Sequence, residues 1–177
     1  TGGIAHGFAR ALAALDDAEI AAVGSRTQEK ADAFGDEFNI PRRYGSYEAL
    51  AADPDLDVVY VATPHVFHRD NAIMCLRAGK AVLCEKAFAI NAGEAAEMVR
   101  AAREEKRFLM EAMFVRHIPI MKEILKWIAG GAIGEVRMVQ ANRCNREELD
   151  TKGRGLNREL GGGSLLDVGI YPLAFAS

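Results

Sequence analysis

Two pairs of ionisable residues stand beside or inside apolar stretches of the sequence. Glu85 and Lys86 directly follow a short apolar run. Asp167 and Tyr171 lie four positions apart in a segment that is otherwise apolar, so on a helix they project from one face. Because burying an unpaired charge is costly, we expect these side chains to pair with one another or to face a wet cavity.

Alcohol oxidation is the chemistry that these residue types could perform. Removing a hydride from a secondary alcohol also releases a proton, which a tyrosine oxygen can accept. A Lys86 cation about 4 Å from Tyr171 would stabilise the phenolate by about 4 kcal/mol at an effective dielectric constant of about 20. Asp167 would then keep Lys86 charged or bind a substrate hydroxyl. The alternative is structural: a buried tyrosine bonded to a carboxylate, and an exposed Glu–Lys pair at a strand end.

The first residues form part of a glycine-rich motif. Thr1-Gly2-Gly3-Ile4-Ala5 fits G-x-G-x-x-[G/A] if one glycine stood before Thr1. In that register Gly2 lets the backbone approach a pyrophosphate, and the small Ala5 lets the following helix pack closely on a sheet. The helix N-terminus would offer its N–H groups to the phosphates. The alternative is an ordinary turn at the start of a helix.

Ser25 and Arg26 follow the next apolar run, about twenty residues after this motif. An NAD-binding protein usually has a carboxylate there, which binds the ribose 2′-hydroxyl. Ser25 can instead donate a hydrogen bond to a 2′-phosphate, and Arg26 can pair with it in forked geometry. The sequence therefore favours NADP, with NAD as the alternative cofactor and a solvated Arg26 as the alternative interpretation.

Thr63-Pro64-His65, with His68 three positions later, follows the apolar run 58–62. In an open α/β sheet the ligand crevice lies outside the carboxyl ends of the strands. We therefore expect these four residues near the ligand, with Pro64 as a rigid apolar edge beside a nicotinamide ring. The four histidines of the chain lack carboxylates at ligand spacing, so no metal site is predicted.

The elements that must position these residues alternate between helix and strand. The predicted helices are 3–15, 27–38, 46–52, 67–78 and 91–105, and the predicted strands are 20–24, 58–62, 81–84 and 108–110. Short connections between them indicate right-handed βαβ units. The fold class predicted for this part is α/β, a Rossmann doubly wound parallel sheet whose first strand is missing.

The pattern changes near residue 114. We expect residues 1–114 to form a dinucleotide-binding domain and 115–177 to begin a substrate-binding domain. This second part contains a predicted helix 119–129, an alternating stretch 135–142 typical of a strand in a mostly antiparallel α+β domain, and a charged loop 146–159. An apolar helix is predicted from residue 165 to the end of the chain. Polar loop residues suited to a polyhydroxylated substrate are Asn142, Asn145 and Arg146.

Composition excludes several classes of function. Half of the 177 residues are apolar, 27% are charged and the net charge is −3, which does not indicate nucleic-acid binding. No apolar run approaches the ~20 residues that span a bilayer, so no membrane partner is expected. The cysteines lie far apart and form no C-x-x-C pair, which predicts reduced thiols in a cytoplasmic protein. They are Cys75, Cys84 and Cys144.

Taken together, these motifs resemble the Gfo/Idh/MocA oxidoreductases along the whole chain. The motifs that carry the resemblance are the glycine turn, 63–65 with His68, 81–86, Met110-Glu111-Ala112, Gly161 and Gly163, and 166–171. Within that family the sequence is most similar to dihydrodiol dehydrogenases and NADP-dependent D-xylose dehydrogenases. The resemblance implies hydride transfer between nicotinamide and a polyol, sugar or dihydrodiol substrate, a homo-oligomer at full length, and a chain missing both ends.

The resemblance also implies roles for individual residues. Those implied to meet the pyrophosphate are Gly2, Gly3 and Ile4. Those implied to face the adenosine ribose or its phosphate are Ser25 and Arg26. Those implied to line the nicotinamide and its ribose are Thr63, Pro64, His65, His68, Glu85 and Lys86. Those implied to be catalytic are Lys86, Asp167 and Tyr171.

Ala87 departs from the family pattern, which usually has proline after the Glu–Lys pair. A cis peptide bond costs ~3 kcal/mol before a residue other than proline, so Ala87 could aim Lys86 differently or hold it less firmly. The second candidate function is accordingly an NADP-binding sensor on the same fold that has lost catalysis. An S-adenosylmethionine-dependent methyltransferase is disfavoured, because it would leave both charged pairs without a purpose.

Overall fold

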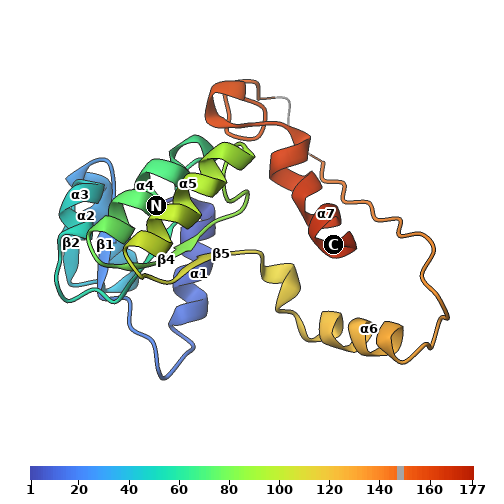
Figure 1. The fold of residues 1–177 in the computed structure, drawn as a ribbon. Coiled ribbons are helices and arrows are strands. Elements are labelled where there is room, and N and C mark those ends of the chain that lie inside the picture. Colours follow the sequence, from blue (N-terminus) through green and yellow to red (C-terminus); the bar gives the residue numbers. More distant parts are fainter. Residues whose placement is uncertain (147–149) are drawn as a thin grey trace.

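The computed structural model describes residues 1–146 and 150–177 (Figure 1). Residues 147–149 of the predicted loop 146–159 lie outside the described residues. The helices are α1 (Gly3–Leu12), α2 (Gln28–Phe38), α3 (Tyr47–Ala51), α4 (His68–Arg77), α5 (Ala92–Glu104), α6 (Pro119–Ala129) and α7 (Ile170–Ala176). The strands are β1 (Ala22–Gly24), β2 (Arg42–Tyr44), β3 (Val58–Val61), β4 (Ala81–Cys84) and β5 (Leu109–Glu111).

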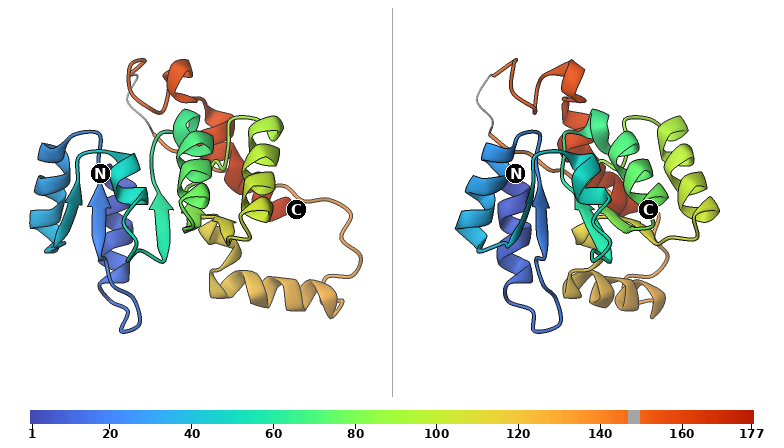
Figure 2. Two further views of the ribbon diagram at one scale, coloured as in Figure 1. Left: turned by 60° about the vertical axis from the view of Figure 1, so that its left-hand side comes forward. Right: turned by 90° about the vertical axis from the view of Figure 1, so that its left-hand side faces the viewer.

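All pairs of neighbouring strands are parallel, as predicted. β1 pairs with β2, with Ala22 opposite Arg42, and β4 lies between β3 and β5. The described strands form two sheets, as expected where the first strand of the predicted sheet is missing. No described strand precedes α1, so no backbone is present to join β1 to β3. The left view of Figure 2 shows these two strands pointing the same way with a gap between their ribbons.

Each sheet has its own apolar core. Residues of α4 and α5 pack on β3 and β4, and the fully buried members of this cluster include Leu76, Val82, Cys84 and Met98. Burial raises the pKa of Cys84 and raises that of Cys75 to about 11, so both thiols are inert packing groups. The smaller core lies between α1, α2 and β1 and consists of Ala9, Val23, Ala31, Phe34 and Ile40.

Local signals determine where several helices begin and end. The side chains of Thr27, Ser46 and Asn91 cap α2, α3 and α5, and each accepts a hydrogen bond from the backbone N–H three residues later. Gly79 follows α4 at φ +82°, as expected for a residue after a helix C-terminus. Helix α1 ends at Leu12, three residues before its predicted end.

The predicted strand 135–142 is absent, and that prediction is wrong. Residues 135–140 are exposed and the stretch runs without regular structure. A strand needs a neighbouring backbone for its hydrogen bonds, and the described chain places none beside it. The expected antiparallel sheet is therefore not formed in residues 115–146 and 150–177.

The end of the chain folds back onto the first part of the molecule (Figure 1). The predicted terminal helix is present, but its first turn, Leu165–Gly169, is π-helical and continues into α7. Helix α7 contacts the turn Phe114–Arg116 that follows β5.

None of the described helices combines the length and the apolar character needed to cross a membrane.

Candidate functional site

The three predicted catalytic residues meet beyond the carboxyl end of β4. Lys86 Nζ donates to the backbone oxygen of Asp167 at 2.6 Å and to its Oδ1 at 3.2 Å. The same Nζ lies 4.9 Å from the ring centroid of Tyr171. The Lys86 and Asp167 side chains are only 13% and 15% exposed, so the ion pair is partly shielded from solvent screening.

Asp167 is shared between two cations. Its Oδ1 also accepts a hydrogen bond from Arg154 Nη1 at 3.0 Å. Burial by itself raises the pKa of this carboxyl, but the hydrogen bond from Arg154 and the charge of Lys86 outweigh burial and hold the pKa below its ordinary value. Asp167 is therefore a carboxylate that holds both cations, and one of them, Lys86, lies beside Tyr171.

The ring of Tyr171 is surrounded by charged and aromatic groups. The Arg143 guanidinium lies 4.3 Å from its centroid, and the ring of Phe114 meets it edge-on at 5.5 Å. Cations over an aromatic face are attracted to its negative quadrupole. Three segments thus fix the ring: the stretch after α6, the turn after β5, and α7 itself.

Glu85 is held by a residue that the sequence analysis did not single out. Tyr60 Oη donates to Glu85 Oε1 at 2.5 Å, and the backbone N–H of Lys86 donates to Oε2 at 3.1 Å. Burial, followed by the contact with Glu85, raises the pKa of Tyr60, so its hydroxyl remains a donor. The Tyr60 ring stacks on Phe8 of α1 at 3.8 Å. In the sequence, the sign of this role was the presence of a tyrosine inside an otherwise apolar strand.

The two predicted histidines near the end of β3 are buried and bonded to backbone oxygens. His65 is 3% exposed, and its Nδ1 lies 3.2 Å from the carbonyl oxygen of Gly161. Burial lowers the pKa of His65, which favours its neutral form. His68 is fully buried, with Nδ1 2.9 Å from Ala87 O and Nε2 2.8 Å from Thr63 O.

Thr63 and Pro64 form the connection between β3 and these histidines. The Thr63 hydroxyl accepts a hydrogen bond from Asn71 Nδ2 at 3.1 Å. Pro64, half-buried, precedes the 3-10 turn His65–Phe67. The structure therefore places all four predicted residues of this motif within one compact segment next to the loop of Lys86.

The glycine-rich start lies at the N-terminus of α1. Gly2 occupies the N-cap position, and a Cβ added at Gly2 or Gly3 would meet no heavy atom within 4 Å. The first N–H groups of a helix have no partner within it, so this open end fits a phosphate group. Ile4 is 54% exposed beside it.

Ser25 and Arg26 lie close to this helix start. The pKa of the Thr1 amino group is lowered, first by burial and then by the charges of Arg26 and Lys30. Arg26 is exposed, whereas Ser25 is 4% exposed and its N–H donates to Tyr44 O at 3.0 Å. The structure thus places the exposed Arg26 near the start of α1.

The sequence profile described as "Oxidoreductase family, NAD-binding Rossmann fold" matches residues 1–113, and the profile of the GFO/IDH/MocA C-terminal domain matches residues 121–177. The chain belongs to the Gfo/Idh/MocA oxidoreductase family. The resemblance seen in the sequence is therefore confirmed. The profile descriptions also confirm a Rossmann NAD-binding fold followed by the start of the family's C-terminal domain.

Several relatives in the Gfo/Idh/MocA family have names that describe an activity. Trans-1,2-dihydrobenzene-1,2-diol dehydrogenase of Xenopus laevis is 44% identical over 179 residues, covering 100% of this chain and 54% of the relative. The Homo sapiens enzyme of the same name is 40% identical over 176 residues, covering 98% and 52%. The chain thus spans about half the length of the curated relatives that it matches.

Solved structures of the family show the same fold. Aldose-aldose oxidoreductase from Caulobacter crescentus, complexed with glycerol, has a TM-score of 0.79 at 34% identity and covers 93% of this chain and 50% of its own. KijD10, a 3-ketoreductase from Actinomadura kijaniata in complex with TDP-benzene and NADP, has a TM-score of 0.76 at 31% identity and covers 95% and 50%.

Ala87, the departure from the Gfo/Idh/MocA pattern, does not turn Lys86 away from its partners. The Lys86–Ala87 peptide bond is cis, and the Lys86 amine reaches both Asp167 and the Tyr171 ring. Besides Tyr60, two further site residues escaped the sequence analysis, Arg143 and Arg154. Both arginines lie in loops whose positions depend on contacts between residues that are distant in sequence. The only sign of them in the sequence was the positive charge of these loops.

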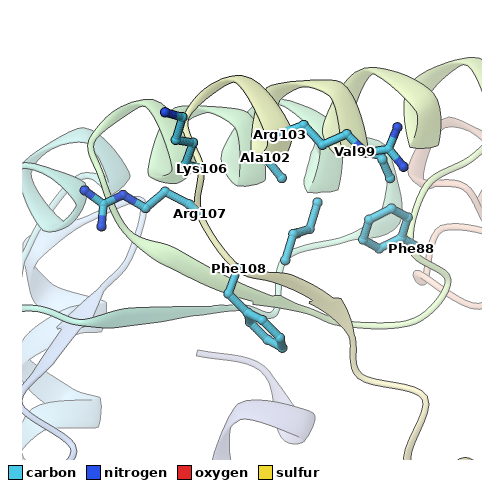
Figure 3. A pocket seen from close by; sticks show the side chains of 8 residues that line it. Phe88, Val99, Ala102, Arg103, Lys106, Arg107 and Phe108 are labelled. Carbon is cyan, nitrogen blue, oxygen red and sulfur yellow. The ribbon is translucent and has the colours of Figure 1, made fainter.

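A pocket of about 410 Å³ lies away from this constellation (Figure 3). Its apolar wall is formed by Phe88, Val99, Ala102, Phe108 and Leu109, and its basic rim by Arg103, Lys106 and Arg107. None of these lining residues belongs to the predicted site.

Among the described residues, no group of three His, Cys, Asp or Glu side chains could hold a metal ion.

Proposed function

We propose that this chain carries the cofactor site and the catalytic residues of an NADP-dependent dehydrogenase. The reaction is hydride transfer between a secondary alcohol of a sugar or cyclic diol and nicotinamide. The observation that carries the proposal is the meeting of Lys86, Asp167 and Tyr171 at the carboxyl end of a Rossmann strand, where α/β sheets bind ligands. When bound, the nicotinamide ring supplies the hydride acceptor.

The chain's own residues would move the proton. In the direction of oxidation, Tyr171 Oη accepts the proton of the substrate hydroxyl. The Lys86 ammonium, 4.9 Å from the ring centroid, stabilises the resulting phenolate by Coulomb attraction. Asp167 holds this ammonium in place through two hydrogen bonds. In the direction of reduction the same three residues return the proton.

Residues at the start of α1 would hold the cofactor. The open space at Gly2 and Gly3 and the unpartnered helix N-terminus suit a pyrophosphate. Arg26 is exposed beside them and suits a 2′-phosphate, which supports NADP over NAD. The Glu85 carboxylate, fixed by Tyr60, would accept hydrogen bonds from the nicotinamide ribose.

The substrate would be a small polyhydroxylated compound. The Xenopus and human relatives are named for a cyclic diol, and the Caulobacter relative is an aldose-aldose oxidoreductase complexed with glycerol. In this chain Arg143 and Arg154 lie next to Tyr171 and Asp167. Their guanidinium groups can donate hydrogen bonds to substrate hydroxyls.

We also propose that residues 1–114 form the dinucleotide-binding domain and that 115–177 begin the substrate-binding domain. The change from alternating strands and helices to an extended segment after β5 supports this division. The separate matches of two family profiles to residues 1–113 and 121–177 support it too.

The test is NADP reduction, followed by absorbance, with a panel of aldoses, cyclic trans-diols and glycerol. We expect turnover with at least one polyol, loss of turnover in Tyr171→Phe, and no change in the control Tyr47→Phe, because Tyr47 belongs to α3 and is not one of the site residues. Tight NADP binding without turnover of any substrate would contradict the proposal and favour a cofactor-binding sensor.

A further inference from the structure

His68 bridges the two loops that follow β3 and β4. It is the first residue of α4 and is fully buried. Its Nε2 lies 2.8 Å from the carbonyl oxygen of Thr63, and its Nδ1 lies 2.9 Å from the carbonyl oxygen of Ala87. One imidazole ring therefore joins the end of the Thr63–Pro64 segment to the residue that directly follows Lys86.

Both neighbours of the ring can only accept hydrogen bonds. A backbone carbonyl has no proton to donate, and a neutral imidazole carries one N–H and one acceptor nitrogen. A hydrogen bond from the ring to Ala87 O therefore requires the N–H to be on Nδ1. Among the described residues His68 makes no salt bridge, and the nearest aromatic ring is that of His65, 5.6 Å away. Two backbone carbonyl oxygens are thus the hydrogen-bond partners of the ring in the described chain.

The bond to Ala87 acts on the loop 85–88. Three side chains hold this loop by hydrogen bonds to its backbone. The Glu85 carboxylate accepts from the N–H of Lys86, and His68 binds Ala87 O. Glu111 Oε1 accepts from the N–H of Phe88 at 3.0 Å. With the backbone fixed on both sides of Lys86, its side chain is directed toward Asp167.

We infer that His68 is a positioning residue whose buried ring fixes the loop 85–88 through Ala87 O and thereby sets the place of the Lys86 amine. The inference rests on the proposed function only for its effect on rate. The geometry of the loop stands independently of it. His68 then acts on the cofactor site through Lys86.

Two substitutions separate positioning from general packing. In His68→Asn the amide nitrogen can replace Nδ1 and keep the bond to Ala87 O. In His68→Gln the amide nitrogen can replace Nε2 and keep only the bond to Thr63 O. Both remove the ring, so we expect similar losses of folding stability but different positions of Lys86.

The primary measurement is NMR of the ¹⁵N-labelled histidine rings in the whole 177-residue chain at neutral pH, with the His68 signals assigned by their absence in His68→Asn. We expect the Nδ1 of His68 to carry a proton, because only an N–H can donate to Ala87 O. A bare Nδ1 would overturn the inference, and this measurement needs no enzymatic activity.

The second measurement compares the variants. We expect the amide signals of Ala87 and Phe88 to stay near their wild-type positions in His68→Asn and to shift in His68→Gln, with kcat lowered about tenfold further in His68→Gln and KM little changed. Equal shifts in both variants would contradict positioning through Ala87. If the wild-type chain reduces no NADP, the proposed function fails, while the NMR result still decides the inference about His68.

Discussion

Lys86 and Asp167 are 81 positions apart in sequence and are joined by two hydrogen bonds from one amine, to the backbone oxygen and to Oδ1 of the same aspartate. The backbone contact ties the amine to the π-helical turn Leu165–Gly169, and the side-chain contact neutralises part of its charge. This single residue pair connects the Rossmann sheet with the segment that carries Tyr171.

The first prediction concerns acid stability. Because the pKa of Asp167 lies below its ordinary value of 3.8 in the folded chain, its ionisation stabilises the fold above that value, and this contribution is lost as the pH falls through the folded pKa. In urea unfolding of wild type and Asp167→Asn, we expect the free energies of unfolding to differ most near neutral pH and to converge on acidification. A difference that is independent of pH would show that the ion pairs with Lys86 and Arg154 contribute nothing.

The second prediction concerns the contact between Gly161 and His65. Gly161 has φ +73°, and a Cβ there would meet His65 Cβ at 3.0 Å and Ile90 Cγ2 at 3.3 Å. Gly131 has the same φ, and a Cβ there would meet nothing within 4 Å. It is therefore a matched control for backbone strain, which costs about 1–2 kcal/mol for alanine in this region.

We expect Gly161→Ala to lower the free energy of unfolding by at least ~1 kcal/mol more than Gly131→Ala, because the neighbours of Gly161 must move to admit a methyl group. Chemical denaturation of both variants provides the comparison. Equal losses would mean that Gly161 is required for its backbone conformation alone and that the segment near His65 is not closely packed.

The third prediction concerns cofactor choice. Arg26 is exposed next to the start of α1, where it can pair with a 2′-phosphate. We expect Arg26→Gln to weaken NADP binding about tenfold or more, since hydrogen bonds to charged groups contribute about 1.5–3 kcal/mol, and to leave NAD binding unchanged. Calorimetric titration with each cofactor measures both affinities, with Arg100→Gln on α5 as the control. An equal loss for both cofactors would assign Arg26 to the shared part of the nucleotide.

Much of the Rossmann part could be predicted because its signals are local. The caps at Thr27, Ser46 and Asn91 act within one turn, and the apolar strands β3 and β4 are recognisable from short runs of residues. The motif positions at strand ends could be predicted as well, since parallel strands direct their carboxyl ends to one edge of a sheet.

The rest depends on contacts between distant segments. The alternation of 135–142 predicted a strand, but a strand forms only beside another backbone. The contact of Arg154 with Asp167 and the stacking of Arg143 on Tyr171 require loops to return to the sheet, which no local pattern encodes. The buried hydrogen bonds of His68 were hidden for the same reason, because Ala87 lies on the next strand connection.

The central claim is that Lys86 and Tyr171 act as one catalytic unit, and a double-mutant cycle of turnover tests it most directly. Lys86→Met and Tyr171→Phe should each lower kcat at least about tenfold, or about 1.4 kcal/mol in activation free energy, whereas Lys122→Met on the exposed face of α6 should change nothing. Residues that act as a unit are not additive, so the double variant should be no slower than the slower single variant. Multiplicative losses in the double variant, or near-normal rates in either single variant, would contradict the account.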